Sequence, residues 1–384
     1  MGVLKINALS ASVLVALALP VGATTAGGVT FNCDPTERAV FRQAAESYLN
    51  ELGIDSHFFD VSETEAGMTL ALREPWAGVS PLDYSTRVDL DLRDEMVSLP
   101  KGPNGELVAV QTVSRKEIAL ALLHPGRNTE APCDLAEFQD HIGIRQNIVA
   151  WAERLYWNWP EGGPAQWNPK HWDKGTPKTS TLDAFYNAFQ QQDQYGIGCY
   201  TATKLVVSQG VLDYYARVRP DYARLSQVLT RVEADKDPLV DIEPPAMWQF
   251  EAEYDSALAS KPGKLLHLQY DVKPLNFVPG DWGYLLNTDP VSYTHTGYEG
   301  SNAIYLGRGK FDDYYNDHSN AYSYRQKMNE VFQWRNGVFS RTRNGYKATP
   351  LSEKNYLTLS ESPERGGQVL PYRAVPYFFK TLPH

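Results

Sequence analysis

The chain has 384 residues, of which 42% are hydrophobic and 21% are charged, so it can bury a core and does not have the composition of a disordered chain. Its 36 Lys and Arg face 46 Asp and Glu, which gives a net charge of -10. This charge argues against nucleic acid and against anionic membranes as partners, because both are recruited by a positive field.

The first 23 residues have the features of a secretory signal. Lys5 precedes an apolar run over 11–19, Pro20 ends that run, and small residues follow up to Ala23. The run is shorter than the roughly 20 residues that span a bilayer. We therefore expect cleavage of 1–23 and a mature protein that is secreted or periplasmic, with no stable membrane insertion.

The chain contains three cysteines, Cys33, Cys133 and Cys199, and an exported protein tends to oxidise the pairs that it can form. Three pairings are possible. If Cys33 pairs with Cys133, the thiol of Cys199 remains, and a leftover thiol is either a reactive nucleophile, an intermolecular link or a buried packing residue.

Residues 24–133 are predicted to form a small N-terminal α+β domain, which is either a pro-segment or a docking module. Asp34-Pro35 predicts the start of a helix that ends near Gly53, and Ser114 predicts the cap of a second helix that ends before Pro125. Strands are expected over three segments, namely 68–72, 84–92 and 107–113.

Residues 134–345 are predicted to form the catalytic domain, and 346–384 a strand-rich extension. Helices are expected over 134–159, 182–191, 200–219 and 326–335, and strands over 265–270, 283–286 and 302–306. Residues 157–177 are rich in Trp, Pro and Gly and indicate an ordered loop or an exposed aromatic wall.

Common catalytic and metal-binding motifs are absent from the sequence: there is no HExxH, paired CxxC, P-loop, GxSxG or full GxGxxG. No cofactor and no metal site are therefore expected. Cys199 is the residue that indicates chemistry, because a thiol at the first turn of a helix is favoured as a thiolate and the glycines before it allow backbone amides to approach.

A thiolate nucleophile needs a base, and the eight histidines of the chain include one, His318, in an acidic segment downstream of Cys199. Nearby carboxylates can orient an imidazole. A solvent-exposed acidic loop with an uninvolved histidine accounts for the same pattern.

Five stretches, in this order, resemble bacterial protein-glutamine gamma-glutamyltransferases of the spore-coat type, which are transglutaminases with a papain-like core related to NlpC-type cell-wall peptidases. The stretches are 145–152 (RQNIVAWA), 195–202 (YGIGCYTA), 279–284 (PGDWGY), 297–307 (GYEGSNAIYLG) and 310–318. The resemblance implies an α+β fold in which a helix bundle packs on an antiparallel sheet.

The resemblance also implies that Cys199 is the nucleophile and His318 the active-site histidine. The sequence departs from the family at two carboxylates, since Ser301 and Gly198 stand where the family has acidic residues. Glu299 is the nearest substitute, because a shift of two residues keeps the same face of a strand. His295 is a further candidate for the base.

The implied reaction is acyl transfer from protein glutamine to lysine amines, or to water. Aromatic walls, drawn from the Trp-rich loop, Trp282 and Tyr298, would favour the amine by excluding water. One alternative is a papain-like cell-wall peptidase or amidase. Another is an exported structural or binding protein with a degenerate site.

Overall fold

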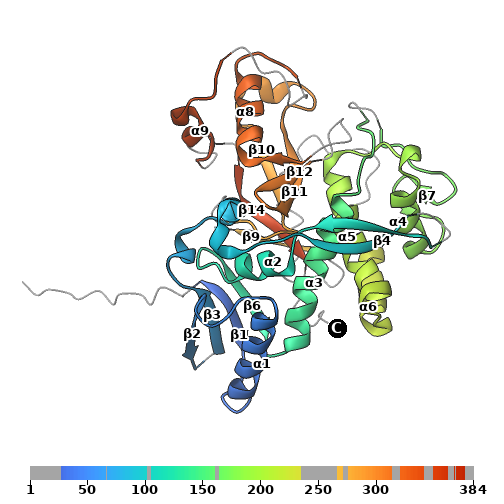
Figure 1. Cartoon of the computed structure of the whole chain (residues 1–384). Helices are drawn as coiled ribbons and strands as arrows, with labels where there is room; N and C mark the ends of the chain where they lie inside the picture. Colours follow the sequence, from blue (N-terminus) through green and yellow to red (C-terminus); the bar gives the residue numbers. More distant parts are fainter. Residues whose placement is uncertain are drawn as a thin grey trace, which may run out of the picture.

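The computed structural model describes residues 27–65, 67–101, 105–160, 164–234, 266–270, 276–313, 321–340, 349–361, 367 and 369–376. The fold is mixed α+β (Figure 1), as the sequence predicts. The helices are α1 (Arg38–Glu51), α2 (Arg115–Leu122), α3 (Leu135–Ala152), α4 (Thr181–Gln190), α5 (Cys199–Asp213), α6 (Tyr222–Ala234), α8 (Tyr324–Arg335) and α9 (Glu353–Leu359). The strands are β1 (Gly28–Asn32), β2 (Phe59–Thr64), β3 (Gly67–Leu72), β4 (Glu95–Pro100), β5 (Leu107–Thr112), β6 (Asn128–Pro132), β7 (Trp172–Asp173), β8 (Thr176–Pro177), β9 (Leu266–Tyr270), β10 (Trp282–Leu286), β11 (Gly300–Gly307), β12 (Lys310–Asp312), β13 (Tyr322–Ser323) and β14 (Val369–Pro376).

The N-terminal part is built on a four-stranded sheet in the order β2-β3-β1-β6. Strand β1 pairs antiparallel with β3 and parallel with β6. A disulfide joins Cys33, just after β1, to Cys133, just after β6. Because the ends of these parallel neighbours lie side by side, the two cysteines are brought together although 100 residues separate them. Cys199 keeps its thiol.

Two local expectations for this part were wrong. Helix α1 begins at Arg38, because residues 35–37 form a turn and the Asp34 side chain is not the cap. The predicted strand over 84–92 is a pair of 3-10 turns, Pro81–Thr86 and Val88–Leu90. Ser80 caps the first turn and Asp91 ends the second with a φ of 42°. Of the alternating apolar residues, Tyr84 and Leu90 are buried, whereas Val88 is exposed.

The second sheet has six strands in the order β13-β12-β11-β10-β14-β9, and every adjacent pair is antiparallel. Strand β14 lies between β10 and β9, so residues 369–376 complete the same sheet that contains β11. The C-terminal region also contains helix α9, which the strand-rich expectation for 346–384 did not include.

Helices cover both faces of this sheet (Figure 1). On one face, Trp282, Tyr284 and Ile304 pack into the large hydrophobic core with α3 and α5. On the other, Leu285, Ala303 and Tyr305 form a separate cluster with residues of α8. The large core also contains residues of β1, β3 and α2, so it is continuous across the predicted domain boundary at 133/134.

A buried carboxyl group connects the N-terminal part to the six-stranded sheet. Glu117 of α2 is 2% exposed, and its Oε1 accepts a hydrogen bond of 2.5 Å from the backbone N–H of Arg308, in the turn between β11 and β12. Burial raises the pKa of Glu117 from 4.5 to about 7. The folded protein therefore holds this proton at pH values where the unfolded chain has released it.

This gives a prediction for stability against pH. The contribution of Glu117 is fully present below pH 4.5 and is lost as the pH rises to about 7, by up to about 3 kcal/mol. Glu117→Gln should therefore gain stability relative to wild type between pH 5 and pH 8 in urea unfolding. Glu65→Gln, at an exposed position, is the control and should follow wild type. Plots of the free energy of unfolding against pH that run parallel for wild type and Glu117→Gln would contradict the prediction.

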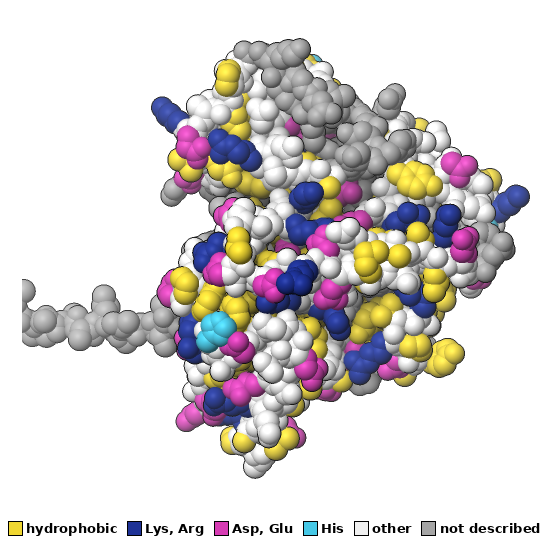
Figure 2. All heavy atoms as spheres, in the orientation of Figure 1, with side chains coloured by type: hydrophobic (Ala, Val, Ile, Leu, Met, Phe, Trp, Pro, Cys, Tyr) yellow, Lys and Arg dark blue, Asp and Glu magenta, His cyan; other side chains and the backbone are white. Residues whose placement is uncertain are grey.

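Basic and acidic side chains alternate over the visible face of the molecule, with no extended area of one sign among the coloured side chains (Figure 2). Among the described residues, no helix combines the length and apolar character needed to cross a membrane. The predicted signal over 1–23 lies outside the described residues.

Candidate active site

The chain approaches Cys199 in an extended segment that is held by the Trp-rich loop. The backbones of Gly196 and Gln166 exchange hydrogen bonds of 2.7 and 3.1 Å, and the N–H of Ile197 donates to the carbonyl of Asn158 at 2.9 Å. The described parts of this loop, 157–160 and 164–177, thus fix the direction from which the chain enters α5.

Cys199 is the first residue of α5, and Gly198 is its N-cap with φ -72° and ψ 162°. The thiol therefore lies at the positive end of the helix dipole, which favours the thiolate. The Thr203 hydroxyl donates to the Cys199 carbonyl at 2.7 Å. Cys199 itself is 1% exposed, so the sulfur sits in a largely desolvated environment.

Asn302 of strand β11 contacts the sulfur. The backbone N–H of Asn302 lies 3.4 Å from Sγ of Cys199, and the side-chain Nδ2 lies 3.6 Å from it. Nε1 of Trp282, on the neighbouring strand β10, donates to Oδ1 of Asn302 at 2.8 Å. The motif at 195–202 and the motif at 297–307 are thus brought together at the thiol.

Ser301, where the resemblance places a carboxylate, belongs to the opposite face of the sheet. Its hydroxyl donates to Oδ2 of Asp313 at 3.0 Å, and Nζ of Lys327 lies 2.6 Å from both Asp313 and Glu330. Adjacent residues of a strand point to opposite faces, so a side chain at 301 points away from the face where Asn302 meets the sulfur. All four residues of this buried polar cluster are at most 2% exposed, namely Ser301, Asp313, Lys327 and Glu330.

Glu299 directly precedes β11, and its carbonyl accepts the N–H of Asn287 at 2.8 Å. We expected it to share the face of Ser301, but β11 begins at Gly300 with a φ of 138°, so strand alternation does not extend back to 299. A Cβ at Gly300 would lie 2.3 Å from the carbonyl oxygen of Leu285. The role of Glu299 stays a prediction.

The structure describes one of the two candidate histidines, His295. His318 lies outside the described residues, so its role also stays a prediction. His295 is exposed, and its ring stacks on Phe339 with 4.1 Å between the ring centroids. Tyr298 belongs to the same aromatic group, packing edge-on against Phe339 and Trp334.

The expected aromatic walls are mainly core. Trp157 and Trp172 are buried in the hydrophobic core, and Trp167 stacks on Trp172 at 4.9 Å. Trp282 is 3% exposed and packs edge-on against Tyr200 at 5.1 Å. Trp282 is the aromatic residue in this set that the structure connects to the thiol, and it does so through its N–H group.

Two further motifs form the scaffold behind the site. Asp281, in the turn before β10, pairs with Arg145 of α3 at 2.8 Å and with Arg127 at 2.5 Å. All three side chains are at most 2% exposed. The carbonyl of Asp281 also accepts the N–H of Tyr305 in β11 at 2.9 Å. The ion pairs of Asp281 with Arg127 and Arg145, together with this backbone hydrogen bond, therefore fix α3, β10 and β11 relative to one another.

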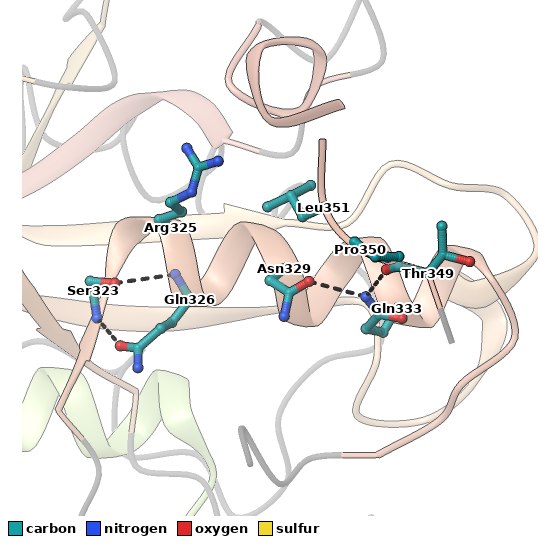
Figure 3. Close-up of a pocket in the computed structure, with 8 residues that line it drawn as sticks. All are labelled: Ser323, Arg325, Gln326, Asn329, Gln333, Thr349, Pro350 and Leu351. Carbon is teal, nitrogen blue, oxygen red and sulfur yellow. Dashed lines mark hydrogen bonds between the residues drawn. The ribbon is translucent and has the colours of Figure 1, made fainter. Parts of the chain in front are cut away.

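A surface groove of about 420 Å³ follows α8 (Figure 3). Ser323 and Gln326 form the capping box of α8, and the amide of Gln333 donates to Asn329 and to the carbonyl of Thr349. The groove is lined by amides, hydroxyls, Arg325 and the apolar Pro350 and Leu351, and its lining contains no thiol. It belongs to α8, which packs on the face of the sheet opposite Cys199, and we do not assign it to catalysis.

Asn302 was missed as a site residue, and Trp282 was expected as an aromatic wall and not as a hydrogen-bond donor to Asn302. The signal in the sequence was a polar asparagine in the apolar stretch of β11, directly after Ser301. No group of three or more His, Cys, Asp or Glu with metal-binding geometry occurs in the part of the chain that the structure describes.

The comparisons with known proteins identify the family. The sequence model for protein-glutamine gamma-glutamyltransferase (TGL) matches residues 129–336, which include Cys199, Asn302 and the Arg145–Asp281 pair. No curated protein matches the chain. Among solved structures, a transglutaminase from Geobacillus stearothermophilus, without its C-terminal extension, aligns at 17% identity with a TM-score of 0.37, covering 64% of this chain and 95% of that one. Because the family match spans more than half of its residues, this chain belongs to the protein-glutamine gamma-glutamyltransferase family.

Proposed function

We propose that the chain is an exported protein-glutamine gamma-glutamyltransferase that uses Cys199 as its nucleophile on a papain-like core. The observation that carries the proposal is the position of this thiol within the family match: it begins α5 and accepts two N–H contacts from Asn302. A helix N-terminus and hydrogen-bond donors both favour the nucleophilic thiolate.

In the proposed reaction, the thiolate attacks the side-chain carbonyl carbon of a protein glutamine. The C–N bond then breaks, and ammonia leaves with a proton from a general acid, for which His318 and Glu299 are the candidates. A lysine amine attacks the resulting thioester, loses a proton and expels the thiolate, leaving an isopeptide cross-link. Water in place of the amine gives glutamate. Substrates are accordingly proteins with accessible glutamine and lysine.

The N-terminal region has a structural part in this proposal. Its core is continuous with that of the catalytic part, and Arg127, which directly precedes β6, donates to the buried Asp281 beside β10. Removing residues 24–133 would take away Arg127 and expose Asp281 and part of the shared core. We therefore propose that this region remains attached in the active enzyme and supports the sheet that bears Asn302.

The test is incorporation of a labelled primary amine into a glutamine-containing peptide by the purified chain, with ammonia release measured in parallel. We expect both signals from wild type, and a large loss of both in His318→Ala if this histidine is the general acid. Glu299→Gln tests the second candidate in the same way. Ammonia release without incorporation would identify a hydrolase. Neither signal from wild type would contradict the proposal.

A further inference from the structure

We propose that Asn302 is a catalytic residue whose backbone N–H and side-chain amide stabilise the thiolate of Cys199, and that Trp282 is a positioning residue that orients this amide. The inference deepens the proposed function, and it rests on that function only for the use to which the thiolate is put. The ionisation of the thiol can be measured without any substrate.

Asn302 provides two hydrogen-bond donors to the sulfur of Cys199. The backbone N–H and Nδ2 of Asn302 approach Sγ of Cys199 at 3.4 and 3.6 Å, within the range of N–H···S hydrogen bonds. Donors of this kind stabilise the charged form of an acid and so lower its pKa. Asn302 is fully buried and Cys199 is 1% exposed, and a hydrogen bond to a charge is stronger in such surroundings than in water.

Trp282 determines which end of the amide faces the sulfur. An indole N–H can only donate, so its 2.8 Å contact with Asn302 must be to the amide oxygen, and the NH₂ group is then directed to Cys199. The indole is held by burial and by its edge-on contact with Tyr200, the residue after the nucleophile. Without this contact the amide could turn and present its oxygen, which would repel a thiolate.

Five charged groups on the surrounding elements are separate from Asn302 and Trp282. Asp313, Lys327 and Glu330 belong to the network at Ser301, on the opposite face of the sheet. Lys204 lies five residues further along α5, and Glu299 precedes β11. Changes confined to Asn302 or Trp282 leave all five in place, so a change in the pKa of the thiol reports on the amide.

The experiment measures the pKa of the Cys199 thiol, from the pH dependence of its ultraviolet thiolate absorbance and of alkylation by iodoacetamide, a reagent small enough for a buried sulfur. The variants are Asn302→Ala, Asn302→Asp and Trp282→Phe, each checked for folding by circular dichroism. Cys199→Ser provides the background signal.

In Asn302→Ala the thiol pKa should rise by roughly one unit, which slows alkylation about tenfold at neutral pH. Asn302→Asp keeps the acceptor for Trp282 but places an anion at the sulfur, so its rise should be larger. Trp282→Phe should give a smaller rise in the same direction. A purely structural role for Asn302 predicts a wild-type thiol pKa in folded Asn302→Ala and in Trp282→Phe.

A thiol pKa equal to wild type in folded Asn302→Ala and Trp282→Phe would overturn the inference, whatever the transferase activity. If the pKa rises as expected while wild type lacks transferase activity, the inference stands and the proposed function fails. If wild type incorporates amine and the variants lose kcat in proportion to their thiolate fraction, both stand.

Discussion

Replacing Cys199 with serine is expected to reduce amine incorporation on the order of 10⁴-fold, because a nucleophile acts together with its base and loss of either removes most of the catalysis. Serine retains nearly the same size at the start of α5, and its hydroxyl oxygen can accept from the same Asn302 donors. The change therefore removes the thiolate with little disturbance of packing. The measurement is the initial rate of labelled amine incorporation.

The control for this variant is Thr230→Ala, on the exposed side of α6, which should keep the wild-type rate. The urea midpoint of Cys199→Ser should also stay near that of wild type. A Cys199→Ser protein that is folded and incorporates amine within tenfold of the wild-type rate would show that the thiol is not the nucleophile.

The second large effect is expected at Asp281. Asp281→Asn removes the negative charge that faces two buried guanidinium groups, Arg127 and Arg145, and should lower the free energy of unfolding by about 3–5 kcal/mol. The reason is that breaking a buried ion pair leaves its partner's charge in a medium of low polarity. Desolvation already lowers the pKa of Arg145 to about 10, so this site is sensitive to its counter-charge.

The comparison is with Asp60→Asn. Asp60 pairs with Arg73 at 2.8 Å, but its side chain is 68% exposed, and such surface pairs contribute about 0–1 kcal/mol. Chemical denaturation of both variants measures the difference. Equal losses of stability in the two variants would contradict the account of Asp281 as the centre of a buried charge network.

Much of the architecture could be predicted from local signals in the sequence. Glycines followed by a long apolar run placed Cys199 at the start of a helix, and the structure confirms this placement. Strands β10 and β11 were located within two residues by their apolar runs. Each of these signals is carried by neighbouring residues, and the structures they specify are local.

One failure had a local cause and the other a non-local one. The alternating pattern over 84–92 has a strand-like period, but Ser80 and Pro81 start a 3-10 turn there. The contact of Asn302 with Cys199 joins residues 103 positions apart and depends on the register of β10 with β11, in which Tyr284 faces Asn302. Because this register sets which face each side chain occupies, Asn302 rather than the residue at 301 reaches the sulfur.

The most direct test of the account is to trap the acyl-enzyme. The chain is mixed with a glutamine-containing peptide in the absence of an amine, quenched in acid, digested and measured by mass spectrometry. The account predicts that the fragment containing Cys199 gains the mass of the peptide minus ammonia, and that a primary amine added before the quench removes this adduct. Amine incorporation that proceeds with no adduct on Cys199, or with the adduct on another residue, would contradict it.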